Sequence, residues 1–230
     1  MSAAYKNRTE AGRELAGRLA AYKDRSDVLV LALPRGGVPV AYEVALALHA
    51  PLDIFLVRKL GVPGHEELAM GAIASDGTLA VNTEVVDALC IPEETLSRCV
   101  RVEQAELARR DKLYRGQRPP PMVQGRTVLI VDDGLATGST MQAALAALRQ
   151  RQPGRLVVAV PIAAAATAEA LRSIADEVIC LRTPEPFYSV SQGYKDFSQT
   201  TDQEVRSLLN LAMTSSIAAE PCREAAPPTL

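Results

Sequence analysis

One segment restricts the possible folds of this chain more than any other. Residues 128–140, VLIVDDGLATGST, begin with four apolar residues, continue with Asp132 and Asp133, and lead through a loop with two glycines. A short continuous apolar run is typical of a strand buried on both faces of a parallel sheet. Acids and glycines after such a strand lie where α/β folds bind ligands. The segment therefore predicts an α/β fold with a ligand site at this point.

The rest of the chain repeats the pattern of buried strand and helix. Four more apolar runs have the length of buried strands, and they lie at residues 28–33, 52–57, 156–161 and 178–181. Helices are expected between and around them, the first capped by Thr9, at residues 9–22, 39–49, 139–150, 165–175 and 202–213. This alternation predicts a doubly wound, mainly parallel twisted sheet with helices on both faces.

Two segments depart from the alternation and predict a small irregular hood or lid. The first, about residues 60–82, contains short strands at 70–74 and 79–82. A mobile loop at His65, Glu66 and Glu67 is expected beside the site. The second, residues 183–200, includes Phe187, Tyr188, Tyr194 and Phe197, which could stack on a base or pack the lid onto the sheet.

The middle and the end of the chain complete the expected organisation. Helices are predicted at 83–89 and 92–115, followed by a proline-containing linker at 116–125. Residues 1–213 are expected to form one domain with its core at about 28–182, and residues 214–230 a disordered tail.

Charge and composition exclude several classes of partner. The 25 basic and 27 acidic residues give a formal charge of −2, which makes nucleic acid an unexpected partner. The four cysteines and two histidines show no metal-ligand spacing. Neither an apolar leader nor an apolar run of about 18 residues occurs, so the sequence predicts a cytoplasmic protein without a membrane partner.

The loop after the strand at 128–131 has the composition of a phosphate-binding loop. Gly134 and Gly138 allow close approach of the backbone, and the first N–H groups of the helix predicted from Ser139 lack intrahelical partners. Such N–H groups carry partial positive charge and suit a phosphate. Thr137, Ser139 and Thr140 can add hydroxyl donors.

Asp132 and Asp133 restrict which phosphate compound can bind, because a carboxylate repels a phosphate. The ligand should carry hydroxyl or cationic groups next to its phosphate. A ribose 5-phosphate fits, with its phosphate in the loop and its 2- and 3-hydroxyls donating to the two acids. The carboxylates would also stabilise positive charge that develops on the sugar during cleavage at the anomeric carbon.

With these residues in register, segment 128–140 resembles the 5-phosphoribosyl-1-pyrophosphate (PRPP) motif of type I phosphoribosyltransferases, from the apolar strand to the Thr-Gly-x-Thr ending. The resemblance covers about residues 28–181. The stretches ALPRGGVPVA, VRKLG, ELAMGAIA and FYSVSQGYKDFSQTT are also similar to a bacterial subgroup of predicted phosphoribosyltransferases. The base pockets of adenine-, hypoxanthine-, uracil- and orotate-specific relatives do not map onto this sequence, so the acceptor base is unidentified.

The resemblance implies that a base nitrogen displaces pyrophosphate from PRPP, with Mg²⁺ bound mainly through the pyrophosphate and ribose hydroxyls of the substrate. Asp132 and Asp133 would hold the hydroxyls and are not expected to bind the metal directly. Arg35, in the loop that follows the strand at 28–33, and Lys59 would neutralise the pyrophosphate. These four are the expected catalytic residues. The expected ligand-binding residues are Arg35, Gly36, Gly37, Lys59, Asp132, Asp133, Gly134, Ala136, Thr137, Gly138, Ser139 and Thr140.

Other interpretations of the acidic motif are weaker. A response-regulator receiver domain needs a phosphorylatable Asp at the end of a later strand, but the strand at 178–181 is followed by Arg182. A P-loop NTPase needs GxxxxGK[ST], which the sequence lacks. A third interpretation is an acidic helix cap with a glycine turn.

One alternative keeps the fold and the site. A regulatory protein could retain the nucleotide site and lose turnover, and a version that binds RNA or DNA should show a basic surface patch. The sequence leaves the assembly open, with a homodimer as the candidate.

Overall fold

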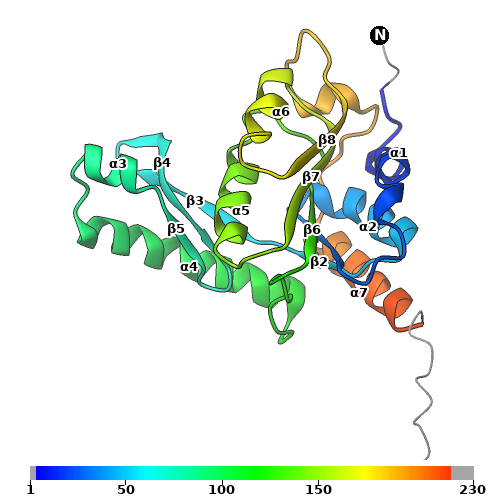
Figure 1. Ribbon diagram of the computed structural model, residues 1–230, viewed down its shortest axis with the longest axis horizontal. Helices are drawn as coiled ribbons and strands as arrows, with labels where there is room; N and C mark the ends of the chain where they lie inside the picture. The colour runs from blue at the N-terminus through cyan, green and yellow to red at the C-terminus, as the bar shows by residue number, and fades with distance from the viewer. Residues whose placement is uncertain (1–3, 219–230) are drawn as a thin grey trace, which may run out of the picture.

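The computed structural model describes residues 4–218, and its central element is a five-stranded parallel sheet (Figure 1). The strand order is β2-β1-β6-β7-β8. The strands are β1 (Val28–Ala32), β2 (Leu52–Ile54), β6 (Thr127–Val131), β7 (Arg155–Ile162) and β8 (Glu177–Arg182). The chain builds outward from β1 to β2 and then returns to the other side of β1 with β6. The loops after β1 and β6 therefore lie side by side but lead to helices on opposite faces of the sheet, which makes this a topological switch point, where such sheets bind ligands.

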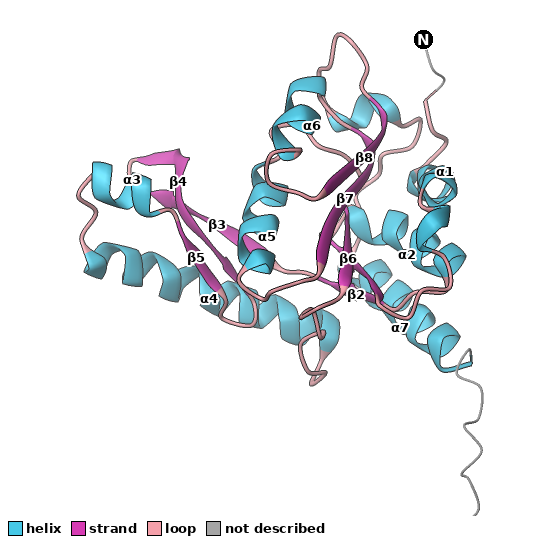
Figure 2. Cartoon of the chain, viewed as in Figure 1, coloured by secondary structure: helices cyan, strands magenta, loops and turns pink. Residues whose placement is uncertain are grey.

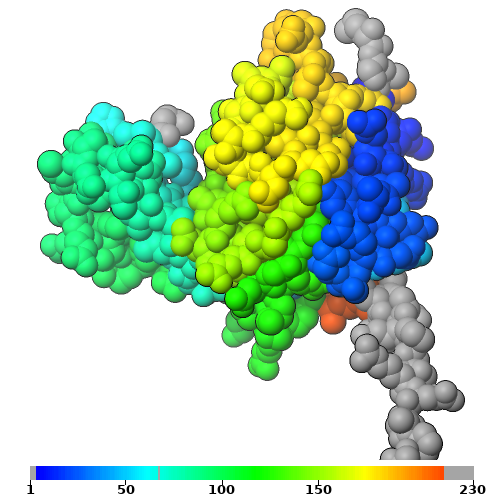
Figure 3. Space-filling view, viewed as in Figure 1, coloured from blue at the N-terminus to red at the C-terminus, as the bar shows by residue number. Residues whose placement is uncertain are grey.

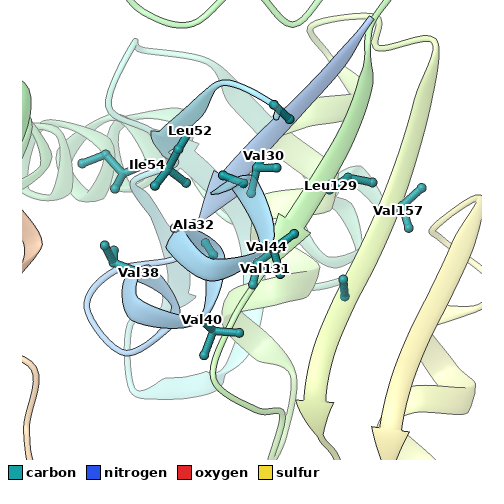
Figure 4. Close-up of a cluster of buried hydrophobic side chains, with 14 of the residues drawn as sticks. Val30, Ala32, Val38, Val40, Val44, Leu52, Ile54, Leu129, Val131 and Val157 are labelled. Atoms are coloured by element: carbon teal, nitrogen blue, oxygen red, sulfur yellow. The ribbon is translucent and has the colours of Figure 1, made fainter. Parts of the chain in front are cut away.

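Helices cover both faces of this sheet. One face carries α1 (Arg8–Arg18), α2 (Gly37–Leu48) and α7 (Asp202–Ala218), and the other carries α5 (Ser139–Arg149) and α6 (Ala165–Leu171) (Figure 1). Alternate residues of each strand pack against the helices on opposite faces of the sheet. In β1, Val28 and Val30 pack toward α2, whereas Leu29 and Leu31 pack toward α5. Figure 4 shows Val30 of β1 and Val44 of α2 among the buried side chains of this first layer. Burial on both faces explains why the strand segments are apolar throughout.

A separate unit, here called the arm (residues 57–115), is inserted between β2 and β6. It contains an antiparallel sheet of order β3-β4-β5, and Figure 2 shows its strands apart from the main sheet. Its elements are β3 (Val57–Val62), β4 (His65–Ala74), β5 (Leu79–Val81), α3 (Thr83–Ala88) and α4 (Glu93–Arg115). The arm stands out from the side of the core in Figure 3, and α5 packs against β3 and β4.

The segment 183–200 runs across the carboxyl end of the sheet and pairs with the start of the chain. It contains a short 3-10 helix, η2 (Val190–Gly193), and a second one, η1 (Ala20–Tyr22), follows α1. The backbone N–H of Tyr5 donates to the carbonyl of Gly193 at 2.8 Å, and the N–H of Lys195 donates to the carbonyl of Tyr5 at 2.7 Å. The rings of Tyr5 and Tyr194 lie 5.6 Å apart. Residues distant in sequence thus close one end of the sheet together.

The predicted fold class is confirmed, but the strand predicted at 52–57 was wrong. β2 ends at Ile54 and a different strand, β3, begins at Val57. Lys59 therefore lies within an antiparallel strand and not at the end of a parallel one. The mobile loop expected at residues 65–67 is also replaced by strand, because a turn at Gly64 with φ of 80° folds β4 back onto β3.

Several helix ends differ from the predictions: α1 ends at Arg18 and not at residue 22, and α6 ends at Leu171 and not at residue 175. Asn7, not Thr9, caps α1, because the Asn7 side chain accepts from the N–H of Glu10. At the other end, α7 continues to Ala218, so residues 214–218 of the predicted tail are helical. The rest of that tail, 219–230, lies outside the described residues. Within residues 4–218, no helix is both long enough and apolar enough to span a bilayer.

Candidate active site

The loops after β1 and β6 touch each other at the carboxyl edge of the sheet. A Cβ atom added to Gly36 would lie 2.0 Å from Oδ2 of Asp133, and one added to Gly37 would lie 2.9 Å from the Cα of Asp132. Only glycine permits this approach. The structure therefore brings together two segments that are 95 or more residues apart and that the sequence singled out as parts of one site.

A hollow of about 310 Å³ opens beside this contact, and we call it the small hollow. Arg35 faces it, with one guanidinium nitrogen 3.5 Å from Oδ1 of Asp202 at the start of α7. The hydroxyl of Tyr114, near the end of α4, donates to the same oxygen at 2.6 Å. The small hollow is lined by Arg8, Arg35, Gly36, Asp133, Phe197, Gln199 and Thr200. Its volume is at the lower end of the range for small-molecule sites.

Arg8 is a site residue that the sequence analysis missed. Its Nε and Nη2 both lie 2.8 Å from Oδ2 of Asp133, and Nη1 donates to the carbonyl of Ser198 at 2.7 Å. The guanidinium carbon lies 4.0 Å from the centre of the Phe197 ring. One arginine near the start of a charged helix carries no local signal of such a role, because its partners are distant in sequence. Only the folded chain reveals the contact.

The acidic pair is held in a poorly solvated place. Burial raises the pKa of Asp132 well above its ordinary value, and the neighbouring charge of Asp133 raises it further. Burial also raises the pKa of Asp133, while the Arg8 guanidinium opposes this shift. The hydroxyl of Tyr194 donates to the backbone carbonyl of Asp133 at 2.5 Å, and burial raises the pKa of that phenol. Arg8 is thus the cation that favours the charged form of the pair.

The predicted phosphate loop leads from the acids into α5. Gly138 precedes the helix with φ of 72°, a conformation that favours glycine. The hydroxyl of Thr167 donates to the carbonyl of Ala136 at 2.6 Å, and the hydroxyls of Thr137 and Ser139 lie 3.1 Å apart. The loop is therefore held by α6, and it leads into the first turn of α5, whose N–H groups lack intrahelical partners.

Gly134 is the point where this loop crosses the end of β7. A Cβ atom there would lie 2.5 Å from Cγ1 of Val190 and 2.8 Å from Cγ2 of Ile162. The adjacent N–H of Leu135 donates to the carbonyl of Ile162 at 3.0 Å. A glycine at this position lets the loop cross between β7 and η2.

A second cavity of about 730 Å³, here called the large cleft, lies between the core and the arm. It is lined by Pro34 and Lys59, by Ser139 and Thr140 of α5, and by arginines of the arm, Arg58, Arg98 and Arg110. Arg58 pairs with Glu103 across the cleft wall at 2.8 Å. The predicted site residues that line a cavity thus divide between two: Lys59, Ser139 and Thr140 line the large cleft. Arg35, Gly36 and Asp133 line the small hollow.

Other residues singled out in the sequence fall outside this arrangement. Tyr188 is 83 % exposed and lines neither cavity. Phe197 lines the small hollow, where its ring is covered by Arg8. Glu66 lines the large cleft. Among the residues that the structure describes, no group of three His, Cys, Asp or Glu side chains could hold a metal ion.

Comparison with known proteins gives three results. A family model described as a phosphoribosyl transferase domain matches residues 3–196. Proteins of two Mycobacterium tuberculosis strains, CDC 1551 and H37Rv, each named "putative phosphoribosyl transferase", are 44% identical over 226 residues, covering 98% of this chain and 51% of theirs. The chain thus spans about half the length of these relatives. The crystal structure of TT1426 from Thermus thermophilus is 40% identical, with a TM-score of 0.84, and the match covers 90% of this chain and 98% of that one.

Proposed function

The chain belongs to the phosphoribosyl transferase family, and we propose that it binds PRPP and transfers the phosphoribosyl group to a nitrogenous base, with release of pyrophosphate. The observation that carries this proposal is the contact of Gly36 with Asp133. It places a glycine-containing loop and an arginine against a carboxylate pair, next to the N-terminus of α5. A ligand with two anionic ends and a hydroxylated centre complements that combination.

The ribose would lie over the acidic pair. Asp132 and Asp133 would accept hydrogen bonds from the 2- and 3-hydroxyls and would favour the positive charge that the ring gains as the bond to pyrophosphate breaks. Because the two carboxyls are poorly solvated, their charge acts at low local dielectric. Only interactions that are stronger in the transition state than in the bound substrate lower the barrier. Because the positive charge develops in the transition state, this pair would act mainly on the rate of the chemical step.

The two phosphate-bearing ends would lie on either side of the ribose. The 5-phosphate would sit at the loop into α5, bound by the backbone and hydroxyls of Gly134, Ala136, Thr137, Gly138, Ser139 and Thr140. Arg35, with the backbone of Gly36 and Gly37, would bind the pyrophosphate and neutralise it as it leaves. Lys59 lines the large cleft with Ser139 and Thr140, so it could reach a phosphate from the arm side.

Magnesium fits this arrangement as a partner of the substrate. Mg²⁺ prefers hard oxygen ligands and commonly enters with phosphate groups. We propose that the pyrophosphate and the ribose hydroxyls supply most of its ligands, with Asp132 and Asp133 acting on those hydroxyls. The ion would offset the negative charge of the leaving group.

Calorimetry with PRPP and Mg²⁺ tests the binding step directly. Saturable binding is expected, and a screen of nitrogenous bases for pyrophosphate release would then identify the acceptor. No binding would reject the proposal. Binding without release for any base would instead indicate a regulatory protein that uses the same site.

The roles of the acids are tested by Asp132→Asn and Asp133→Asn. Each change should lower the rate of pyrophosphate release by about 100-fold or more while the fold survives. Asp24→Asn is the matched control, because Asp24 is exposed at the opposite edge of the sheet. Unchanged rates in both site variants would contradict the assigned roles. The cytoplasmic location and the homodimer remain predictions, which fractionation and light scattering would check.

A further inference from the structure

The side chain of Arg8 is fixed by three parts of the chain. Nε and Nη2 contact Oδ2 of Asp133, Nη1 donates to the carbonyl of Ser198, and the ring of Phe197 covers the guanidinium. The side chains of Arg8 and Asp133 are 11% and 14% exposed. An arginine with so little freedom keeps its partner in one orientation.

The contact leaves Asp133 able to bind a ligand. Both Arg8 nitrogens meet the same oxygen, Oδ2, and an ionised carboxylate accepts about four hydrogen bonds in total. Asp133 also lines the small hollow. A hydroxyl that enters the hollow therefore finds a carboxylate that is already oriented and already paired with a cation.

The position of Arg8 argues against a role in stabilising its own helix. It is the first residue of α1, where the helix dipole disfavours a cation. Its pairing with Asp133 also removes both charges from most of their hydration, which seldom adds stability. A second buried pair, Arg115 with Asp53, lines neither the small hollow nor the large cleft. Of these two buried pairs, the one formed by Arg8 is thus the one that opens onto a cavity.

We propose that Arg8 is a positioning residue of the phosphoribosyl site: it holds the Asp133 carboxylate ionised and oriented for the ribose hydroxyls. The proposal rests on the function proposed above and adds a residue from outside the segments that resemble the family motifs. Four groups face Asp133 in this arrangement: Arg8 from α1, Asp132 from its own loop, Arg35 from the loop after β1, and Tyr194 from segment 183–200. Arg8 alone among them makes a charged contact with the carboxylate.

A double-mutant cycle tests whether Arg8 acts through Asp133. PRPP binding in the presence of Mg²⁺ is measured by calorimetry for the wild-type chain, Arg8→Met, Asp133→Asn and the double variant. Arg8→Met should weaken binding by about 10- to 100-fold, the range for loss of a hydrogen-bonded charge. In the Asp133→Asn background, the same change should cost less than about threefold, because the carboxylate that Arg8 orients is gone.

Two further variants make the test specific. Arg8→Lys keeps the cation and should bind PRPP more tightly than Arg8→Met does. If Arg8→Met does not fold, the double-mutant cycle with Arg8→Lys in its place tests whether Arg8 acts through Asp133. Arg13→Gln is the matched control on the same helix, because Arg13 is exposed and pairs with Glu43 away from both cavities. It should bind PRPP like the wild type.

The outcomes separate this inference from the proposed function. If the wild-type chain does not bind PRPP, the proposed function fails and the role of Arg8 fails with it. If the wild type binds and Arg8→Met binds equally well, only the role of Arg8 is rejected. An equal loss in both backgrounds would also overturn it, because Arg8 would then act independently of Asp133.

Discussion

Gly36 shows how one residue without a side chain permits the whole site. Any Cβ there would collide with the Asp133 carboxylate, 2.0 Å from Oδ2 and 2.6 Å from Cγ. We expect Gly36→Ala to push the two loops apart and to weaken PRPP binding at least about tenfold, measured by calorimetry. Gly17→Ala is the control, because nothing lies within 4 Å of its added Cβ in α1. It should leave binding unchanged and raise stability by up to about 1 kcal/mol.

The buried acids should make stability depend on pH in a defined direction. A raised pKa means that the folded state keeps the proton to a higher pH than the unfolded chain does. The pair therefore opposes folding increasingly as pH rises from the ordinary carboxyl value, about 4, through the raised value. Below about pH 4 both states are protonated and the effect vanishes.

Asp132→Asn should consequently melt at a higher temperature than the wild type at pH 7 to 8. The difference should shrink as pH falls toward about 4, because the wild-type carboxyl is then neutral in both states. Thermal melts across this range measure it. A stabilisation that does not change with pH would indicate a packing effect. If the difference does shrink as pH falls, the fold carries an acidic pair that lowers stability at neutral pH in return for a site.

At the scale of elements, a buried ion pair joins helix α4 of the arm to strand β2 of the core. Arg115, at the end of α4, is 5% exposed, and its Nε lies 3.1 Å from Oδ1 of Asp53 in β2, at an angle that does not make a hydrogen bond. Burial raises the pKa of Asp53 and Arg115 lowers it. The pair replaces apolar packing at the point where the long arm helix returns to the sheet.

Arg115→Met should therefore cost about 3–5 kcal/mol of unfolding free energy in urea melts, because it removes the cation that contacts the buried Asp53 carboxyl. Arg115→Met combined with Asp53→Leu should recover much of the loss. On the same helix, Arg109 pairs with Glu106 at the surface, so Arg109→Met should change little. If Arg115→Met and Arg109→Met lower the free energy of unfolding equally, the buried pair contributes no more to stability than the surface pair does.

For the whole molecule, we propose that residues 1–213 fold as one domain, with the arm as its least stable part. Strands β1 and β6 are buried along their whole length, whereas α3 has no buried residue. Hydrogen exchange should be slowest in the two strands and fastest in α3. Added PRPP and Mg²⁺ should slow exchange at residues 34–37 and 132–140. If the arm and the core unfold in two separate transitions in a urea melt, the proposal of a single domain is contradicted.

The sequence alone predicted the parallel core, which the structure confirms, and it singled out the loops of the candidate site. Strands that are buried on both faces must be apolar throughout, so residues 28–33 and 128–131 could be predicted as strands without knowing which elements pack against them. The acids and glycines that follow residues 128–131 indicated a ligand site in the same local way. These local signals persist in the folded chain because they arise from backbone geometry and burial.

Tertiary structure decided what distant residues do to one another. Whether residues 52–57 form one strand or two depends on β4, which supplies the hydrogen bonds of β3 from a later part of the chain. Tertiary packing also places Lys59 and Arg35, both predicted to bind pyrophosphate, in different cavities. It likewise brings Arg8 into contact with Asp133 across 125 positions. The spacing of apolar residues shows which side of an element is buried, but it does not identify the element that packs against that side.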